Sequence, residues 1–168
     1  MKEKHYHNAL KWIVNILNKN KIKFNVIGGL AAHAYGSKLR FNDIDLLMNL
    51  KDMRRLERLE KNHVILKPWN GTSSNKIWKG YIMKLNYKGI LIEITEAKNT
   101  KIFNKEKGKY EKFPAGLENS KIKNLLGLKV PIMPKENLVG YKSKLRFPND
   151  LIDLESLTNK TREKQTKG

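Results

Sequence analysis

Residues 22–48 constrain the fold of this chain more than any other segment. Apolar and polar side chains alternate over 22–27, as they do in a β-strand with one buried face. Gly28 and Gly29 follow at once, and the small residues after them favour a turn that opens a short helix. A second strand is predicted over 43–48, where apolar residues accompany two aspartates. A strand, a turn, a helix and another strand in close succession indicate a sheet with helices packed against it.

The remaining segments add elements of both kinds. Helical spacing of apolar residues predicts helices over 5–19, 51–61, 134–146 and from Pro148 onward. Alternation predicts a short strand over 63–66, a hairpin of 77–86 with 89–95, and an extended segment over 130–134. The polar, lysine-rich residues 97–123 are expected to form a long loop. We therefore predict an α/β (α+β) fold with a mixed, twisted sheet flanked by helices, a single domain over 1–157 and a flexible C-terminal tail over 158–168.

Composition excludes several classes of protein. The 168 residues include no cysteine, which excludes disulfide scaffolds, Cys-ligated zinc, iron–sulfur clusters and thiol catalysis. No stretch approaches the roughly 18 consecutive apolar residues that a membrane span requires. The first residues lack the apolar core of a signal peptide. We expect a cytoplasmic protein that does not act at a membrane.

The chain is strongly basic along its whole length. Its 35 Lys and Arg residues outnumber its 16 acidic residues, which gives a formal net charge of +19. Basic residues exceed acidic ones in each third of the sequence, so the charge does not belong to a detachable tail. Such a chain attracts polyanions, and nucleic acids or phosphorylated small molecules are the expected partners. A general bias toward Lys, Asn and Ile codons is an alternative explanation of the same charge.

Three acidic residues stand out in this basic chain. Asp43 and Asp45 share one face of their predicted strand, because side chains alternate between the faces of a sheet. Two carboxylates held together repel each other unless a cation lies between them. Glu93 lies between isoleucines on a later strand and would join them if the two strands pair. The pattern predicts a site for a divalent cation, with Mg²⁺ favoured and Mn²⁺ as the second choice.

The glycine pair offers a complementary feature. Gly28 and Gly29 end one strand and open a helix, so backbone N–H groups can approach an anion without a Cβ in the way. A phosphate-binding turn next to a metal-binding strand would suit a nucleoside triphosphate.

The order of these motifs resembles the DNA polymerase β-like nucleotidyltransferase superfamily. Its small prokaryotic single-domain members, of the minimal, lincosamide and abortive-infection toxin types, are the most similar. The resemblance rests on Ile27-Gly28-Gly29, Asp43-Ile44-Asp45-Leu46 and Ile92-Glu93-Ile94, and on the C-terminal segments 130–146 and 150–154. It covers roughly residues 22–157 and implies the nucleotidyltransferase fold.

The resemblance also implies roles for particular residues. Asp43 and Asp45 would hold two Mg²⁺ ions at the triphosphate of a bound NTP such as ATP, and Glu93 would complete the metal site and favour deprotonation of an acceptor hydroxyl. Gly28 and Gly29 would bind the nucleotide. Further cations near the triphosphate would come from Arg40, Lys142 and Lys144.

The resemblance leaves the acceptor open. The chain lacks the extra helical domain of larger relatives. We therefore expect the acceptor site within 64–88, within 97–123, or at the interface of a homodimer. The basic charge favours RNA, such as a tRNA end, over a small hydroxyl-bearing molecule. Trp69, Trp78 and Tyr81 lie among lysines and are candidates for a base-stacking surface, or simply for the core.

Two alternatives to an enzyme remain at this point. One is a catalytically silent nucleotide- or nucleic-acid-binding module of the same fold, acting in a toxin–antitoxin or regulatory system. The other is a basic RNA-binding protein whose acidic residues are incidental.

Overall fold

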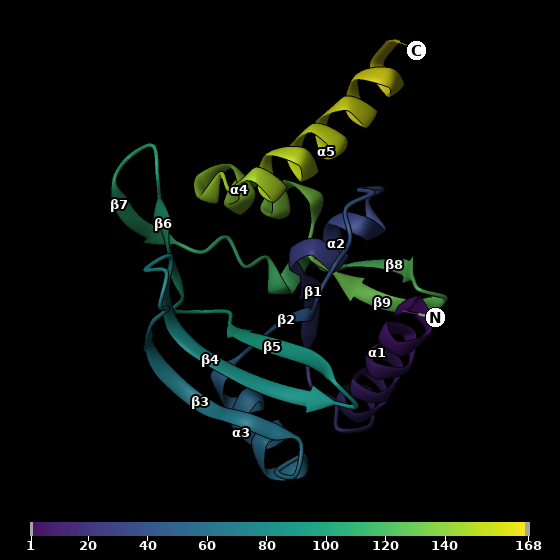
Figure 1. The fold of residues 1–168 in the computed structure, drawn as a ribbon, viewed down its shortest axis with the longest axis vertical. Helices are drawn as coiled ribbons and strands as arrows, with labels where there is room; N and C mark the ends of the chain where they lie inside the picture. The colour runs from purple at the N-terminus through teal and green to yellow at the C-terminus, as the bar shows by residue number, and fades with distance from the viewer. Residues whose placement is uncertain (1, 167–168) are drawn as a thin grey trace.

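The computed structural model describes residues 2–166 (Figure 1). The α-helices of this part of the chain are α1 (Lys2–Lys19), α2 (Gly28–Ala34), α3 (Leu50–Leu59), α4 (Lys135–Leu145) and α5 (Pro148–Thr166). The strands are β1 (Phe24–Ile27), β2 (Ile44–Met48), β3 (Val64–Thr72), β4 (Trp78–Tyr87), β5 (Ile90–Glu96), β6 (Lys101–Asn104), β7 (Lys109–Lys112), β8 (Lys121–Leu125) and β9 (Leu128–Ile132).

The strands form one mixed sheet. Its order is β7-β6-β4-β5-β2-β1-β9-β8, and β3 pairs with β4 outside this path. β2 runs parallel to β5, and β1 runs parallel to β9. The pairs β1–β2, β4–β5 and β3–β4 are antiparallel. The mixed sheet flanked by helices confirms the predicted fold class.

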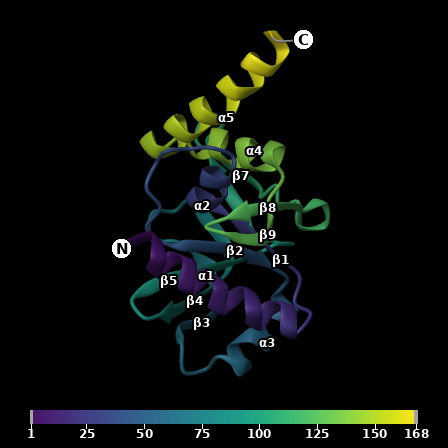
Figure 2. The same ribbon diagram turned by 90° about the vertical axis from the view of Figure 1, so that its right-hand side faces the viewer.

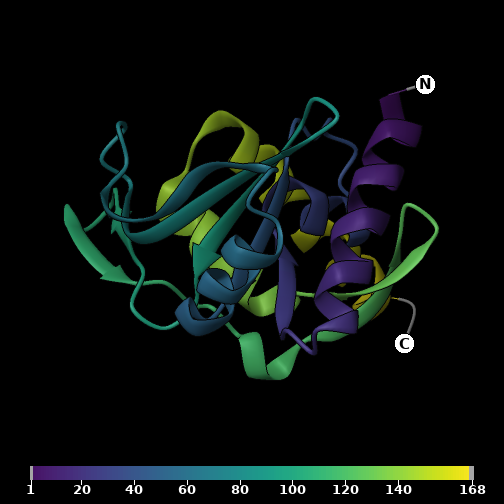
Figure 3. The same cartoon turned by 90° about the horizontal axis from the view of Figure 1, so that it is seen from below.

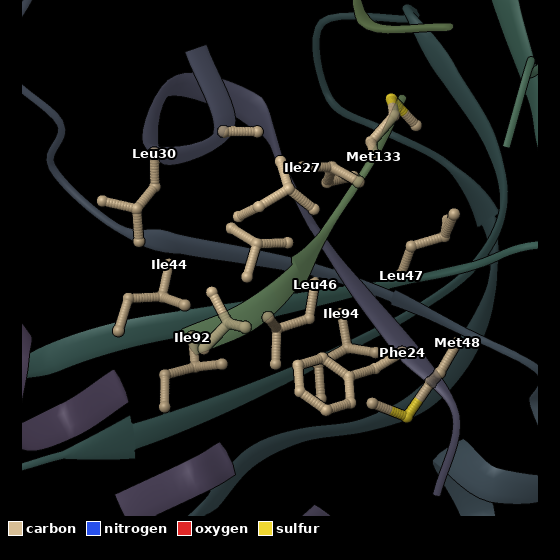
Figure 4. Close-up of a cluster of buried hydrophobic side chains, with 14 of the residues drawn as sticks. Phe24, Ile27, Leu30, Ile44, Leu46, Leu47, Met48, Ile92, Ile94 and Met133 are labelled. Carbon is tan, nitrogen blue, oxygen red and sulfur yellow. The ribbon is translucent and has the colours of Figure 1, made fainter. Parts of the chain in front are cut away.

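The centre of the sheet carries the core. Ile44, Leu46, Ile92 and Ile94 occupy one face of β2 and β5, and all four are fully buried (Figure 4). The helices α1 and α3 contact β5 and lie in front of the sheet in Figure 3. The helices α2, α4 and α5 contact one another at the other side, in the upper half of Figures 1 and 2. The two groups of helices thereby cover different sides of the sheet.

Strand β1 differs from the half-buried strand that its alternation predicted. All of its residues are buried, including Asn25. The strand lies between β2 and β9, and the Asn25 side chain donates a hydrogen bond to the Gly116 carbonyl and accepts one from Ser120. The polar Asn25 can be buried because groups from a distant segment form hydrogen bonds with its side chain.

The expectation of a long loop over residues 97–123 is wrong. This segment forms the β6–β7 hairpin, a 3₁₀ turn and most of β8. Apolar residues at wide intervals, Ile102, Phe113 and Leu117, are buried and anchor it to the rest of the molecule. Most of the lysines in this segment are exposed, and an exposed, lysine-rich composition is equally typical of a loop.

Two other elements are longer than predicted. Strand β3 reaches Thr72, whereas the sequence indicated a strand over 63–66 only. Helix α5 continues to Thr166, so most of the predicted tail at 158–168 is helical. The flexibility of that tail stays a prediction, and residues 167–168 lie outside the described part of the chain.

None of the helices among the described residues combines the length and apolar character needed to cross a membrane. The cytoplasmic location inferred from the sequence stays a prediction.

Candidate functional site

Pairing of β2 with β5 brings the three acidic residues together. Asp45 lies directly opposite Glu93 in the parallel pair, and Asp43 precedes β2 by one residue. The pleat turns Ile44 and Leu46 toward the core, so Asp45 and Glu93 point to the other face. One carboxylate oxygen from each of Asp43, Asp45 and Glu93 lies within 4.8 Å of the others. The predicted cluster therefore exists in the fold.

The cluster carries more negative charge than its surroundings neutralise. Burial raises the pKa of Asp43, and the charge of Glu93 raises it further. Burial also raises the pKa of Asp45 well above its usual range, with added contributions from Asp43 and Glu93. Lys84 faces Glu93 across the β4–β5 pair, and its Nζ lies 3.3 Å from Glu93 Oε1. Lys84, together with Lys142 in the case of Asp45, lowers these pKa values but offsets burial and the repulsion among the carboxylates only in part.

The donor set fits a divalent cation. Three carboxylates with converging oxygens are the hard ligands that Mg²⁺ and Mn²⁺ prefer. A cation among them would also reverse the repulsion that raises the pKa of Asp43 and Asp45. Asp43, Asp45 and Glu93 are thus the residues that could hold the metal.

The glycine turn lies beside Asp45, and its two glycines differ in role. Ile27 is the register partner of Asp45, so Gly28 begins at the level of the carboxylates. Gly28 has a φ of +68°, and a Cβ there would lie 2.1 Å from Asp45 Oδ2. A Cβ on Gly29 would meet only the Phe41 Cβ, at 3.9 Å. Folding therefore requires glycine at position 28, whereas position 29 has room for a side chain.

Helix α4 closes over the turn. The buried Tyr141 hydroxyl accepts a hydrogen bond of 2.8 Å from the Gly28 N–H. Burial raises the pKa of Tyr141, so the phenol keeps its proton at neutral pH. The Gly28 N–H is consequently engaged by the protein.

Lys142 is held by two acidic residues of α5. Its Nζ lies 3.0 Å from Asp150 Oδ1 and 3.0 Å from Asp153 Oδ2, and all three side chains are buried. Burial lowers the pKa of Lys142, but Tyr141, Asp150 and Asp153 outweigh it and raise the pKa above the usual range. Asp153 also accepts a hydrogen bond of 2.5 Å from Ser37. The network joins α4, α5 and the segment after α2.

The other two predicted cations, Arg40 and Lys144, do not line the cleft. Arg40 is exposed on the loop that leads to β2. Lys144 forms an ion pair of 3.1 Å with Glu111 of β7. Neither residue lines the cleft that contains Asp45 and Glu93, whereas Lys142 does. Their predicted part in nucleotide binding stays a prediction.

A cleft of about 510 Å³ opens beside the carboxylates. One side is formed by Gly28, Gly29 and α4, and the other by β3, β4 and the turn between them. The three candidate aromatic residues all border it but face different surroundings. Trp78 packs against Phe113 and Tyr141, and Tyr81 lies under Arg54 of α3. Of these three aromatic residues, only Trp69 is exposed.

Sequence reasoning missed several residues that shape this site. Tyr141 and Lys84 lie in ordinary helical and strand patterns, and only the tertiary structure brings them to Gly28 and Glu93. Asp150 lies in the first turn of α5, where its carboxylate accepts a hydrogen bond from the Phe147 N–H. Its second partner, Lys142, could not be deduced from the pattern.

Several solved structures share the fold of this chain. No protein-family model matches the chain, and no curated protein matches it. A candidate nucleotidyltransferase from Thermotoga maritima aligns with a TM-score of 0.69 at 21% identity, covering 95% of this chain and 94% of the other. The lincosamide antibiotic adenylyltransferase LnuA, solved with lincomycin bound, aligns with a TM-score of 0.58 at 16% identity, covering 90% and 95%. The antibiotic-resistance factor ANT(2'')-Ia aligns with a TM-score of 0.61 at 14% identity, covering 95% and 85%.

These similarities extend over nearly the whole described chain and concern the fold. They agree with the resemblance drawn from the order of the glycine pair and the acidic strands. This chain has the nucleotidyltransferase fold.

Proposed function

We propose that this protein is a metal-dependent nucleotidyltransferase that moves a nucleoside monophosphate from an NTP to an acceptor hydroxyl. The observation that carries the proposal is the convergence of Asp43, Asp45 and Glu93 within 4.8 Å, in the nucleotidyltransferase fold. In the reaction, the acceptor oxygen bonds to the α-phosphorus, the bond to pyrophosphate breaks, and the hydroxyl proton is released.

Each part of the cleft has a task in this proposal. Asp43, Asp45 and Glu93 would hold Mg²⁺ or Mn²⁺, which when bound neutralises triphosphate charge and makes the acceptor hydroxyl more acidic. The turn at Gly29 presents backbone to the phosphates, since no side chain intervenes there. Glu93 lies on β5, on the other side of β2 from the strand that carries this turn, and it would complete the metal site and favour deprotonation of the acceptor hydroxyl.

We further propose that the acceptor is RNA. The formal charge of +19 supports a polyanionic partner. Structural neighbours have been solved with lincomycin and with adenylyl-tobramycin, which are small molecules. A small hydroxyl-bearing acceptor is therefore the alternative to test. A homodimer and the nature of the preferred nucleotide stay predictions.

Incubation of the protein with labelled NTPs, Mg²⁺ and either total RNA or a panel of small hydroxyl compounds tests the reaction directly. We expect label in RNA and release of pyrophosphate, both lost in Asp45→Asn. NTP affinity should rise with Mg²⁺ in the wild type but not in the variant.

Other outcomes would separate the alternatives. Metal-dependent NTP binding without transfer to any acceptor would indicate a silent nucleotide-binding module. Transfer to a small compound alone would overturn the RNA acceptor. NTP binding that ignores both Mg²⁺ and the Asp45 substitution would overturn the proposed function itself.

A further inference from the structure

Trp69 is an unusual residue in the wall of the cleft. It lies on β3 and borders the same cleft as Asp45 and Glu93, yet 46% of its surface is exposed. An exposed indole is costly to leave in water, since aromatic side chains gain much of their stabilisation from burial. A large aromatic residue at the edge of a polar cleft is a candidate for contact with a ligand.

The backbone holds the Trp69 ring in place. Its six-membered ring covers Gly71, two residues further along β3. A Cβ on Gly71 would lie 2.2 Å from one carbon of that ring and 2.3 Å from the next. Only glycine leaves room for the indole to lie against the strand. One ring face is thus supported by the backbone, which fixes its orientation before any ligand binds.

The strand register aims Trp69 at the site. Trp69 is opposite Ile82, Ile82 is opposite Thr95, and Ile82 and Thr95 both line the cleft. The β3–β4 register shifts between Leu66 and Trp69. Such irregularities often turn a side chain toward a functional site. Trp69 thereby joins the face of the sheet that carries Glu93, which lies two strands away (about 10 Å across the sheet) and two residues further along.

Trp69 also lies on a definite side of the carboxylates. The sheet order places β1, with the glycine turn, on one side of β2, and β5, β4 and β3 on the other. If the triphosphate lies at the turn, as the proposed function requires, the β3–β4 wall is left for the acceptor. This inference therefore rests on the proposed function.

The charge of this wall restricts the acceptor. The acidic residues among those described that line the cleft are Asp45, Glu93 and Asp150. The first two belong to the metal site, and Asp150 is paired with Lys142. The β3–β4 wall itself contributes Lys79 and Lys84 and no carboxylate. A polycationic acceptor would find no counter-charge there, whereas a planar ring with a phosphate nearby would be compatible.

We infer that Trp69, supported by Gly71, is a stacking platform for the nucleobase of the acceptor nucleotide, whose ribose presents the reacting hydroxyl. The base could belong to the end of an RNA strand or to a free nucleotide, and the recognition chemistry is the same. Stacking on an aromatic ring is tolerant of base identity, so the platform would select a nucleotide end rather than a sequence.

The test compares two oligoribonucleotides that differ only in the terminal residue, one with its base and one abasic. Their affinities are measured by fluorescence anisotropy with Mg²⁺ and a non-hydrolysable NTP analogue, for the wild type, Trp69→Ala, Trp69→Leu and Trp69→Phe. Loss of one stacked base should weaken binding roughly 5- to 100-fold. We expect that loss in Trp69→Ala and Trp69→Leu, and a smaller one in Trp69→Phe.

The abasic oligonucleotide provides the decisive comparison. It should bind the wild type as weakly as the intact one binds Trp69→Ala, and the two changes together should cost no more than either alone. Gly71→Ala should produce a similar loss, because it displaces the ring while keeping it. Ile122→Ala, at a 67% exposed position on β8 that lines neither the cleft nor the hollow beside β3, is the control and should change nothing.

The outcomes keep the inference apart from the proposed function. If NTP binding is normal but Trp69→Ala binds both oligonucleotides like the wild type, the platform is refuted and the proposed function stands. If a free nucleotide binds the wild type as tightly as the oligonucleotide and is weakened equally by Trp69→Ala, the rest of the strand contributes nothing to binding and the acceptor is a nucleotide rather than an RNA end. Failure of the wild type to bind NTP with Mg²⁺ would instead refute the proposed function.

Discussion

At the scale of single residues, the two neighbouring glycines make a matched pair of tests. Gly28→Ala places a Cβ 2.1 Å from Asp45 Oδ2 at a φ of +68°, so it should lower the melting temperature and disturb the carboxylates. Gly29→Ala has open space around it and should fold like the wild type. If Gly29→Ala binds NTP more weakly, as isothermal titration calorimetry can measure, the added methyl group prevents the close approach of the ligand to the backbone. Equal melting temperatures for the two variants would contradict the assignment.

The charged form of Asp45 lowers the stability of the folded protein at neutral pH. Because its pKa is raised in the folded state, the charged form disfavours folding at neutral pH. Asp45→Asn removes that charge, so without metal the variant should be more stable than the wild type at pH 7. The difference should shrink as the pH falls toward the ordinary pKa of aspartate, where the wild type folds with the proton bound. Thermal melts in EDTA across this pH range would show it, and a less stable variant at pH 7 would contradict it.

At the scale of elements, the contact between α4 and α5 depends on one buried cation. Lys142→Met would leave Asp150 and Asp153 buried without their partner, and removing one member of such a group costs about 3–5 kcal/mol. Lys144→Met, two residues further along α4, removes an ion pair with Glu111 near the surface and should cost much less. Urea denaturation of the two variants measures the difference. Comparable losses would show that the buried network is not a structural support.

The β6–β7 hairpin adds a pH-dependent contact to the same helix. Glu111 accepts a hydrogen bond from Asn104 and contacts Lys144 and Lys107, and these partners lower its pKa from 4.5 to about 2. Stability from this carboxylate is therefore present above pH 4.5 and lost as the pH falls toward 2. Wild-type protein should exceed Glu111→Gln in denaturant midpoint at pH 6, and the gap should close by about pH 2. A gap independent of pH would contradict this account.

The elements also show how far the sequence alone could be used. Periodicity and the glycine turn were sufficient for α1, β1, α2, β2, α3, the β4–β5 hairpin and the closing helices. The order of the acidic strands was sufficient for the cluster of Asp43, Asp45 and Glu93. The β6–β7 and β8 strands were missed because widely spaced residues such as Ile102 and Phe113 anchor them. Tyr141 and the partners of Lys142 were missed because they depend on contacts between segments distant in sequence.

At the scale of the whole molecule, the charge predicts a steep salt dependence of RNA binding. Each contacted phosphate of a single strand contributes about −0.7 to the slope of log affinity against log salt, so several contacts give roughly −3 or steeper. The lysines of the β6–β7 hairpin are less suitable than their composition suggests. Lys105 lies over the Phe147 ring, and Lys107 pairs with Glu111.

A better candidate for the path of the strand is the hollow beside β3, which is lined by Arg58, Lys61 and Lys67 among others. Reversing these three charges should flatten the slope by about 2 without changing NTP affinity. Reversing Lys2, Lys4 and Lys11, which are exposed on α1, is the control and should have a smaller effect. Equal effects of the two triple variants would indicate that the lysines act only as diffuse charge.

The pairing of β1 with β9 has a consequence for the newly made chain. Val26 pairs with Ile132, and the Gly28 N–H donates a hydrogen bond to Tyr141, which lies 113 residues later in the sequence. At a synthesis rate of about 5–20 residues per second, this interval is roughly 6–23 s. The glycine turn leaves the ribosome well before the residues of β9 and α4 that pair with it. A growing chain therefore carries Asp43 and Asp45 for several seconds before Tyr141 is made and can accept the hydrogen bond from Gly28, and the cleft is complete only when α4 has emerged.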